Sequence, residues 1–263
     1  MTVSRALISA EEARFYSRAG YLVKPNVLTA EELASLRQAV DEASATRYDV
    51  AHDGTGRDAR YDAVFHQKVN LWQVHPGIRR HTFTPRIAEM ARVLMGVRAV
   101  RLWHDQLLVK QPGQPTPTPF HQDLTYWPME QDLAMTAWTA LDDVDESNSC
   151  MQYIPGSHQW GVYDAVDFMS PQGVAEVAKG HEADCVAVSA PVPAGSVIFH
   201  HSLTFHGATA NVTDRPRRAM IIHYQADGVT FNGRAHIVSD VAGLTKGEPI
   251  AGHGLWPILA EAA

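Results

Sequence analysis

The sequence predicts a mainly β fold, an antiparallel sandwich or barrel, preceded by helices. Helix-starting signals gather in the first hundred residues, short β-like runs follow from about residue 98, and no helix-periodic segments alternate with those runs. We expect one domain over 1–263, with a helical start over about 1–97, a barrel over about 98–226 and an irregular tail over about 227–263.

The start of the chain carries three helix signals. Ser9 and Thr29 are each followed three residues later by a glutamate, Glu12 and Glu32, which is the pattern of a capping box. After the second box, apolar residues recur at helical spacing at 33, 36 and 40. A third helix is expected over 84–96, because this segment begins Thr-Pro and ends at a glycine.

The middle of the chain has the texture of short strands. Proline and glycine separate apolar runs, for example at 112–113, 155–156 and 215–216. We predict seven strands, at 98–103, 106–110, 135–141, 150–154, 185–189, 196–199 and 219–224.

Composition excludes several classes of function. The formal net charge of −7 disfavours DNA, RNA or an anionic membrane surface as a partner. Two cysteines, Cys150 and Cys185, are too few for a disulfide framework. The sequence has neither the apolar core of a signal peptide near its first residue nor an apolar run of roughly 18 residues, so we expect a cytoplasmic protein without a membrane span.

The triplet His121-Gln122-Asp123 carries the main chemical signal. On an extended strand, residues two apart point to the same side, so His121 and Asp123 can reach one metal while Gln122 faces away. A third ligand, His206, would come from another strand. Two imidazoles and one carboxylate suit Fe(II) and leave its opposite face open for a chelating acid and oxygen. Arg217, eleven residues later (217 − 206 = 11), is suited to bind a second carboxylate.

Each of these residues also has an ordinary interpretation. With 14 histidines in the chain, a His-x-Asp triplet arises by chance, and a lone histidine is more often structural than a ligand. Arg215 and Arg218 compete with Arg217, and alternation along the strand does not choose between them because both faces are apolar. We interpret His200 and His201 as structural.

Further residues have open roles. His104 and Asp105 could contact a substrate or cap a strand. The aromatic residues that could line an apolar pocket are Trp103, Phe120, Tyr126, Trp127, Tyr153 and Phe231.

Several longer motifs surround these residues. They are FHQDLTYWP at 120–128, WTA at 138–140, DESNSCM at 145–151 leading into IPGSH at 154–158, and HGATAN at 206–211 with DRPRRA at 214–219. Together they resemble the phytanoyl-CoA dioxygenase family of iron(II)/2-oxoglutarate oxygenases. The resemblance extends from the helical start to about residue 224.

The resemblance implies a double-stranded β-helix, a jelly-roll form, with helices packed on one side. It implies that His121, Asp123 and His206 bind iron, and that Arg217 forms a salt bridge with the distal carboxylate of 2-oxoglutarate. It also implies that Lys68, Gln106 and Trp138 lie near that cosubstrate. One departure is Ala208, where family members often have a serine; Thr209 is a candidate for the missing hydroxyl.

The leading hypothesis is therefore a 2-oxoglutarate-dependent dioxygenase that uses Fe(II) and O2 to hydroxylate a small molecule, releasing succinate and CO2. Asp123 argues against a halogenating variant, because it fills the position where chloride would bind. The alternatives are a cupin-like metal enzyme that needs no keto acid, and a non-catalytic metal-binding barrel. The substrate and the oligomeric state, monomer or homodimer, stay open.

Overall fold

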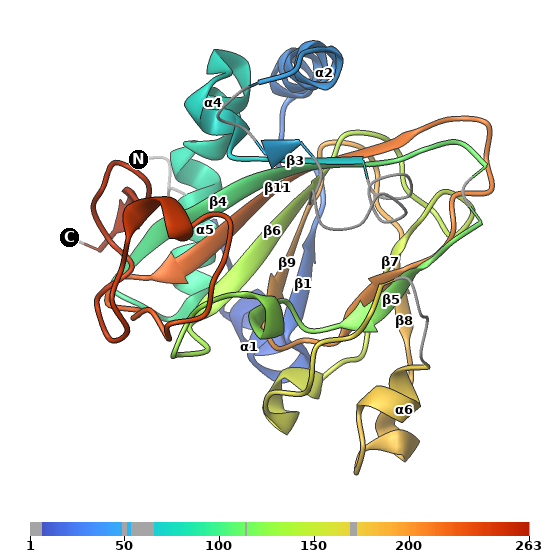
Figure 1. Ribbon diagram of the computed structural model, residues 1–263. Helices are drawn as coiled ribbons and strands as arrows, with labels where there is room; N and C mark the ends of the chain where they lie inside the picture. The colour runs from blue at the N-terminus through green and yellow to red at the C-terminus, as the bar shows by residue number, and fades with distance from the viewer. Residues whose placement is uncertain (1–6, 49–51, 54–65, 114, 169–172, 263) are drawn as a thin grey trace, which may run out of the picture.

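The computed structural model describes residues 7–48, 52–53, 66–113, 115–168 and 173–262, and two antiparallel β-sheets facing each other dominate it (Figure 1). In the larger sheet the strand order is β1-β9-β6-β11-β4-β3-β2, with β12 paired to β4, and in the smaller sheet it is β5-β10-β7-β8. The mainly β prediction is confirmed. The strands of the larger sheet are β1 (Tyr21–Lys24), β2 (His52–Asp53), β3 (His66–Val69), β4 (Ala99–Lys110), β6 (Ala134–Ala140), β9 (Val197–His201), β11 (Arg217–Ala226) and β12 (Ile258–Glu261); those of the smaller sheet are β5 (Thr118–His121), β7 (Met151–Tyr153), β8 (Val188–Ala190) and β10 (His206–Ala208).

The three predicted helices form where the capping signals place them. Ser9 and Thr29 complete capping boxes at the starts of α1 (Ala10–Ala19) and α2 (Ala30–Ala45). Helix α5 (Pro85–Met95) ends at Gly96, which adopts a left-handed conformation with φ 66°. Two further helices, α4 (Pro76–Thr82) and α6 (Val174–Val177), were not predicted.

The central strands of the larger sheet are covered on both faces. One face packs against α1, α2, α4 and α5 through an apolar cluster that includes Leu36, Ile78, Ile87, Phe199 and Ile222. The other face looks toward the smaller sheet, as Figure 1 shows, and contributes Trp138 and Ile221 to a second cluster with residues of β7 and β10. Every residue of β6 is therefore buried.

A β-bulge joins two predicted strands into one. The runs 98–103 and 106–110 form the continuous strand β4, because β11 is long enough to pair with both. His223 pairs with His104 and Tyr224 with Leu102, so Trp103 has no partner on β11. The extra residue reverses the alternation of side chains: Leu102 before the bulge and Leu107 after it both pack against the helices. His104 thereby turns toward the space between the sheets.

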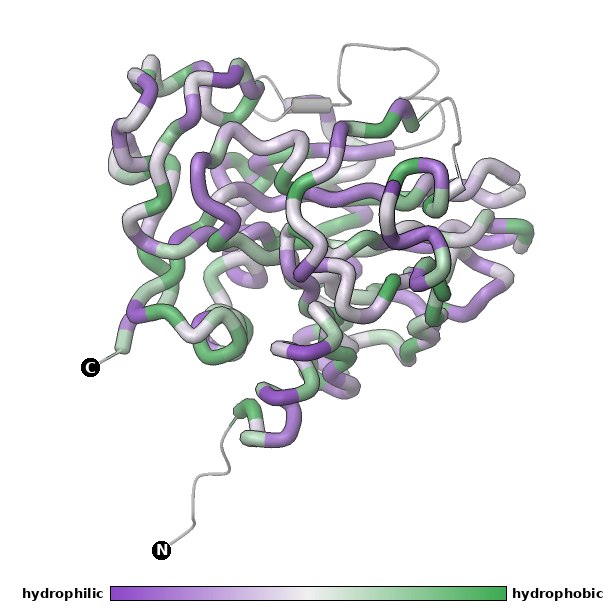
Figure 2. The backbone as a smooth tube through the Cα atoms, turned by 90° about the horizontal axis from the view of Figure 1, so that it is seen from below, coloured by the Kyte–Doolittle hydropathy of each residue, from purple (hydrophilic) through white to green (hydrophobic). Residues whose placement is uncertain are grey.

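The boundaries of other predicted segments also change. The expected helical start contains β1 and β3, which pair with β9 and β4 far along the chain. The expected irregular tail contains the 3-10 helix η5 (Asp240–Ala242) and β12, and the strand predicted at 185–189 begins at Val188. Figure 2 shows hydrophilic and hydrophobic stretches alternating along the chain trace. Among the described helices, none has the length and apolar character needed to span a membrane.

Candidate active site

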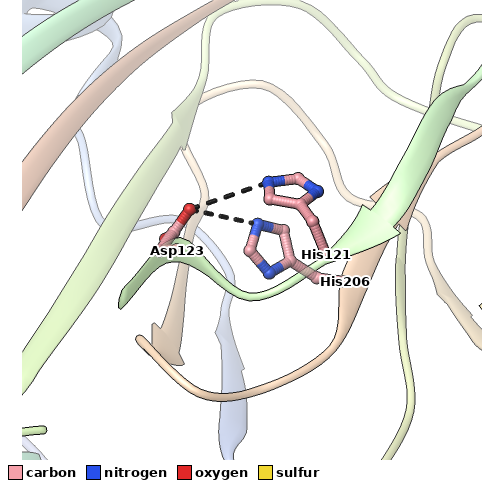
Figure 3. Close-up of side chains that lie close together, drawn as sticks. All are labelled: His121, Asp123 and His206. Atoms are coloured by element: carbon pink, nitrogen blue, oxygen red, sulfur yellow. Dashed lines mark ion pairs between the residues drawn. The ribbon is translucent and has the colours of Figure 1, made fainter. Parts of the chain in front are cut away.

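His121, Asp123 and His206 converge between the two sheets. His121 ends β5 and His206 begins β10, its neighbour in the smaller sheet, so the two residues pair directly in the register. Gln122 is extended, with φ −111° and ψ 134°, and this carries Asp123 back to the same side as His121. Oδ1 of Asp123 lies 3.7 Å from Nε2 of His121 and 3.6 Å from Nε2 of His206 (Figure 3).

Gln122 faces away from the other two side chains of its triplet, as the sequence predicts. Its amide donates to the carbonyls of Gly161 and Leu203, and its side-chain oxygen accepts from the backbone N–H of Tyr163. Gln122 therefore ties the loop around residue 161 to the segment that carries Asp123.

Both histidines present an unprotonated nitrogen to the centre of the triad. Nδ1 of His121 lies 2.9 Å from the carbonyl oxygen of Pro119, and Nδ1 of His206 lies 2.9 Å from that of Thr204. A carbonyl only accepts, so each Nδ1 carries the hydrogen and each Nε2 keeps its lone pair for a metal. Burial, followed by the effect of a neighbouring histidine, lowers the pKa of both rings to about 4, which favours the neutral, ligating form.

Asp123 is held by two further side chains. Its Oδ2 accepts hydrogen bonds from Thr136 Oγ1 at 2.7 Å and from His200 Nε2 at 3.2 Å. Burial opposes its ionisation, but His206 and the hydrogen bond from His200 outweigh burial, and the pKa of Asp123 lies well below its usual range. Asp123 is therefore a carboxylate at neutral pH. Within the described chain, these three residues are the one group that brings three ligand atoms within 4.8 Å of one another.

The structure gives His200 and His201 different surroundings. His200 reaches Asp123, whereas His201 accepts from the backbone N–H of Leu203 and lies beside His158. The sequence interpretation of His200 as structural missed its contact with Asp123. Adjacent histidines on one strand point to opposite faces, and the sequence carried no signal that chose between the faces.

A cavity of about 590 Å³ extends from the triad between the sheets. Arg217 lines this cavity and is fully buried, and its Cζ lies 5.1 Å from the ring centroid of Trp138. Nη2 donates to Ser149 Oγ at 2.9 Å, whereas the buried Nε and Nη1 have no hydrogen-bond partner. Burial lowers the pKa of Arg217 to about 10, so the guanidinium is still charged at neutral pH. A buried cation with two unused donors matches a carboxylate ligand.

The other predicted cosubstrate residues divide into two groups. Gln106 and Trp138 line the cavity with Arg217. Lys68 does not: its ammonium donates to the carbonyl of Thr46 at 2.5 Å, on the side of the sheet that faces α2. Successive residues of a strand point to opposite faces. The two residues that flank Lys68, which are Gln67 and Val69, therefore line the cavity instead.

Some of the residues whose roles the sequence left open line the cavity, and others do not. His104 lines the cavity, whereas Asp105 points away from it and accepts from Thr82 Oγ1 and the backbone N–H of Trp72. Ala208 lines the cavity, and the Thr209 hydroxyl donates to the carbonyl of Glu146. Of the candidate aromatic residues, the cavity wall contains Tyr126 and Trp127 but not Trp103, Phe120, Tyr153 or Phe231.

Sequence reasoning missed Lys110. It pairs with Arg217 in the register between β4 and β11 and has no exposed surface. Burial, followed by the charge of Arg217, lowers the pKa of Lys110 to about 7. Lys110 is therefore a second buried basic group beside Arg217, but it lies outside the cavity wall and its ammonium donates to the carbonyl of Thr116 at 3.1 Å. Its place at the end of a predicted strand gave no reason to expect that its side chain is buried beside Arg217.

Comparison with known proteins agrees with this geometry. The family model of phytanoyl-CoA dioxygenase (PhyH) matches residues 16–219. The chain belongs to the PhyH family. Peroxisomal phytanoyl-CoA dioxygenase from Rattus norvegicus is 26% identical over 240 residues, which cover 85% of this chain and 70% of the rat protein.

Two solved structures share the PhyH fold over nearly the whole chain. The non-heme alpha ketoglutarate dependent carbocyclase SnoK from nogalamycin biosynthesis is 32% identical, with a TM-score of 0.79, over 96% of this chain and 97% of SnoK. The epimerase SnoN, solved in complex with Fe3+, alpha ketoglutarate and nogalamycin RO, is 28% identical, with a TM-score of 0.78, over 95% of this chain and 98% of SnoN. The expected jelly-roll fold with helices on one side is confirmed.

Proposed function

We propose that this chain is an Fe(II)/2-oxoglutarate-dependent dioxygenase that hydroxylates an unactivated C–H bond of a small molecule, with release of succinate and CO2. The observation that carries the proposal is one cavity with a metal triad in its wall and a buried, incompletely hydrogen-bonded guanidinium in the same wall. The triad would bind the metal, and the guanidinium would bind one carboxylate of a diacid cosubstrate.

The residues fit Fe(II). Two neutral imidazole nitrogens and one carboxylate oxygen form the donor set that non-heme Fe(II) oxygenases use, and no thiolate among the described residues joins it. His121, Asp123 and His206 would hold the ion. Bound iron, together with 2-oxoglutarate and O2, would supply the oxidising chemistry that these side chains lack.

The protein's own part is to bind, orient and exclude water. Arg217 would donate hydrogen bonds through Nε and Nη1 to the distal carboxylate of 2-oxoglutarate. The hydrogen bond to Ser149 and the contact with the ring of Trp138 orient the guanidinium. Gln106 lines the same wall. The two sheets shield this region from water, which strengthens the ionic contact.

The substrate would occupy the part of the cavity farther from Arg217. Tyr126, Trp127 and Phe168 provide aromatic surface there, and His104 and His223 provide polar contacts. Among the described lining residues, Arg217 is the sole lysine or arginine. The described part of the wall therefore offers no lysine or arginine beyond Arg217 for a phosphorylated carrier such as a CoA thioester, which supports the proposal of a compact substrate without phosphate groups.

An anaerobic titration with Fe(II) and 2-oxoglutarate tests the proposal. The wild-type protein should develop the weak visible charge-transfer band of the chelate, and His121→Ala should abolish it. His201→Ala is the matched control, because His201 is a neighbouring histidine turned away from the triad. A wild-type protein that binds the metal but gives neither the band nor succinate would support the alternative, a cupin-like enzyme that needs no keto acid.

Two expectations stay predictions. The sequence favours the cytoplasm, and cell fractionation checks this. The chain is expected to be a monomer or a homodimer, and light scattering on the purified protein distinguishes the two.

A further inference from the structure

We propose that Thr136 and His200 are positioning residues that hold Oδ2 of Asp123 away from the metal, so that the carboxylate offers Oδ1 alone. We call this pair the Asp123 clamp. The inference rests on the proposed function, because its purpose is to keep the open face of the metal free for 2-oxoglutarate and oxygen.

The contacts of Asp123 separate its two oxygens. Oδ1 faces Nε2 of His121 and of His206, at 3.7 and 3.6 Å. Oδ2 receives Thr136 Oγ1 at 2.7 Å and His200 Nε2 at 3.2 Å. Thr136 is 2% exposed and His200 is 1% exposed, so bulk water does not compete for these hydrogen bonds. One oxygen is directed at the metal site and the other is saturated by the protein.

The hydrogens in this network can be assigned from chemistry. Ionised Asp123 only accepts, so the single hydroxyl hydrogen of Thr136 is donated to Oδ2. Nδ1 of His223 lies 2.8 Å from Thr136 Oγ1 and its Nε2 lies 3.2 Å from Gln106 Oε1, so this ring links the Thr136 hydroxyl to Gln106. In the same way His200 donates through Nε2, and its Nδ1, 3.1 Å from the Tyr153 hydroxyl, accepts from Tyr153.

Each donor of the clamp is thus held by a partner on another strand. Thr136 on β6 is oriented by His223 on the adjacent strand β11. His200 on β9 is oriented by Tyr153 on β7, across the gap between the two sheets. Two independent supports approach Oδ2 from different elements, and this restricts rotation of the carboxylate.

The restriction has a consequence for the metal. Three protein donors on one face leave the opposite face to the cosubstrates. A carboxylate free to rotate can bind through both oxygens, and its second oxygen would then occupy part of that open face. The clamp prevents this as long as both hydrogen bonds persist.

The chain offers matched variants. Thr136→Val removes the hydroxyl and keeps the shape, whereas Thr136→Ser keeps the hydroxyl. His200→Leu removes the ring donor. The control is Thr139→Val on the same strand, because Thr139 is fully buried, faces the helices and bonds to His81 instead of Asp123. It loses a comparable hydrogen bond without touching the clamp.

The experiment titrates each metal-free protein with Co(II) alone and follows its visible absorption. We expect Thr136→Val and His200→Leu to bind Co(II) about 10- to 100-fold more weakly and with an altered absorption intensity, which reports a changed coordination. Thr136→Ser and Thr139→Val should match the wild type. Equal Co(II) affinity and equal spectra for Thr136→Val and Thr139→Val would overturn the proposal, as would failure of Thr136→Ser to restore the wild-type values.

Addition of 2-oxoglutarate then separates this inference from the proposed function. If wild-type Co(II) protein shows no spectral response to 2-oxoglutarate, the proposed function fails, while the Co(II) titration still decides the clamp. If the wild type responds and Thr136→Val needs at least about 10-fold more 2-oxoglutarate, the second oxygen has entered the open face as we infer. An unchanged requirement would refute that step.

Discussion

Replacing Arg217 with methionine should stabilise the ligand-free protein while it abolishes cosubstrate binding. Arg217 is fully buried, and two of its nitrogens have no hydrogen-bond partner. Burial lowers its pKa from the usual 12.5 to about 10, and this corresponds to a cost of about 3 kcal/mol for the charged form. The hydrogen bond to Ser149 and the contact with Trp138 offset about 1–2 kcal/mol of that cost. Arg217→Met should therefore raise the free energy of unfolding by about 1–2 kcal/mol.

The pH dependence of this stability cost follows from the difference in the pKa of Arg217 between the folded and unfolded states. Because the pKa of Arg217 is lower in the folded state, its cost is present at every pH below about 10 and declines as pH rises through that value. Urea unfolding of the metal-free proteins near neutral pH measures the difference. Arg218→Met is the control: Arg218 is the next residue on β11 and forms ion pairs with Asp142 and Asp41, so its loss should lower stability.

Ligand addition completes this test. Metal and 2-oxoglutarate should stabilise the wild type by mass action, whereas Arg217→Met should gain stability from the metal alone. An Arg217→Met protein that is less stable than the wild type without ligands would refute the account of Arg217 as a cation kept for its ligand. A variant that still gains stability from 2-oxoglutarate would refute the assignment of Arg217 to the distal carboxylate.

Three further predictions concern buried groups near the site. Burial raises the pKa of Asp105 from 3.8 to about 7, so the folded protein loses stability as the pH rises through this range. Asp105→Asn should therefore make the urea midpoint depend less on pH between pH 4 and about 8. Gly207→Ala would place a Cβ 2.7 Å from the carbonyl oxygen of Thr118; we expect a loss of about 1–3 kcal/mol in urea unfolding and weaker Co(II) binding, because β10 must move away from β5. Lys110→Met should weaken the binding of 2-oxoglutarate in competition titrations but leave the binding of pyruvate unchanged, because pyruvate lacks the distal carboxylate. Equal effects on the binding of both acids would contradict an electrostatic role of Lys110 beside Arg217.

Local patterns in the sequence were sufficient for part of the fold and part of the site. The capping boxes at Ser9 and Thr29 predicted two helix starts correctly, because capping depends on residues within one turn. The spacing of His121 and Asp123 predicted their common direction, since an extended backbone at Gln122 is all that it requires. His206 needed the resemblance to a family as well, because its pairing with His121 joins distant parts of the chain.

Strand registers and faces were decided by tertiary structure. The bulge at Trp103 reverses the alternation along β4 and turns Gln106 into the cavity, and it is a feature of the register between β4 and β11, which are distant in the sequence. The register of β3 against β4 places Gln67 in the cavity and Lys68 outside it.

The amino-acid sequence by itself determined which residues have the chemistry to bind a metal and a diacid, and where helices begin. Only the tertiary structure decided which of two adjacent side chains enters the site, as for His200 over His201 and Gln67 over Lys68. The physical reason is that a strand directs neighbours to opposite faces. When both faces are covered, by helices on one side and a second sheet on the other, local sequence no longer tells the faces apart.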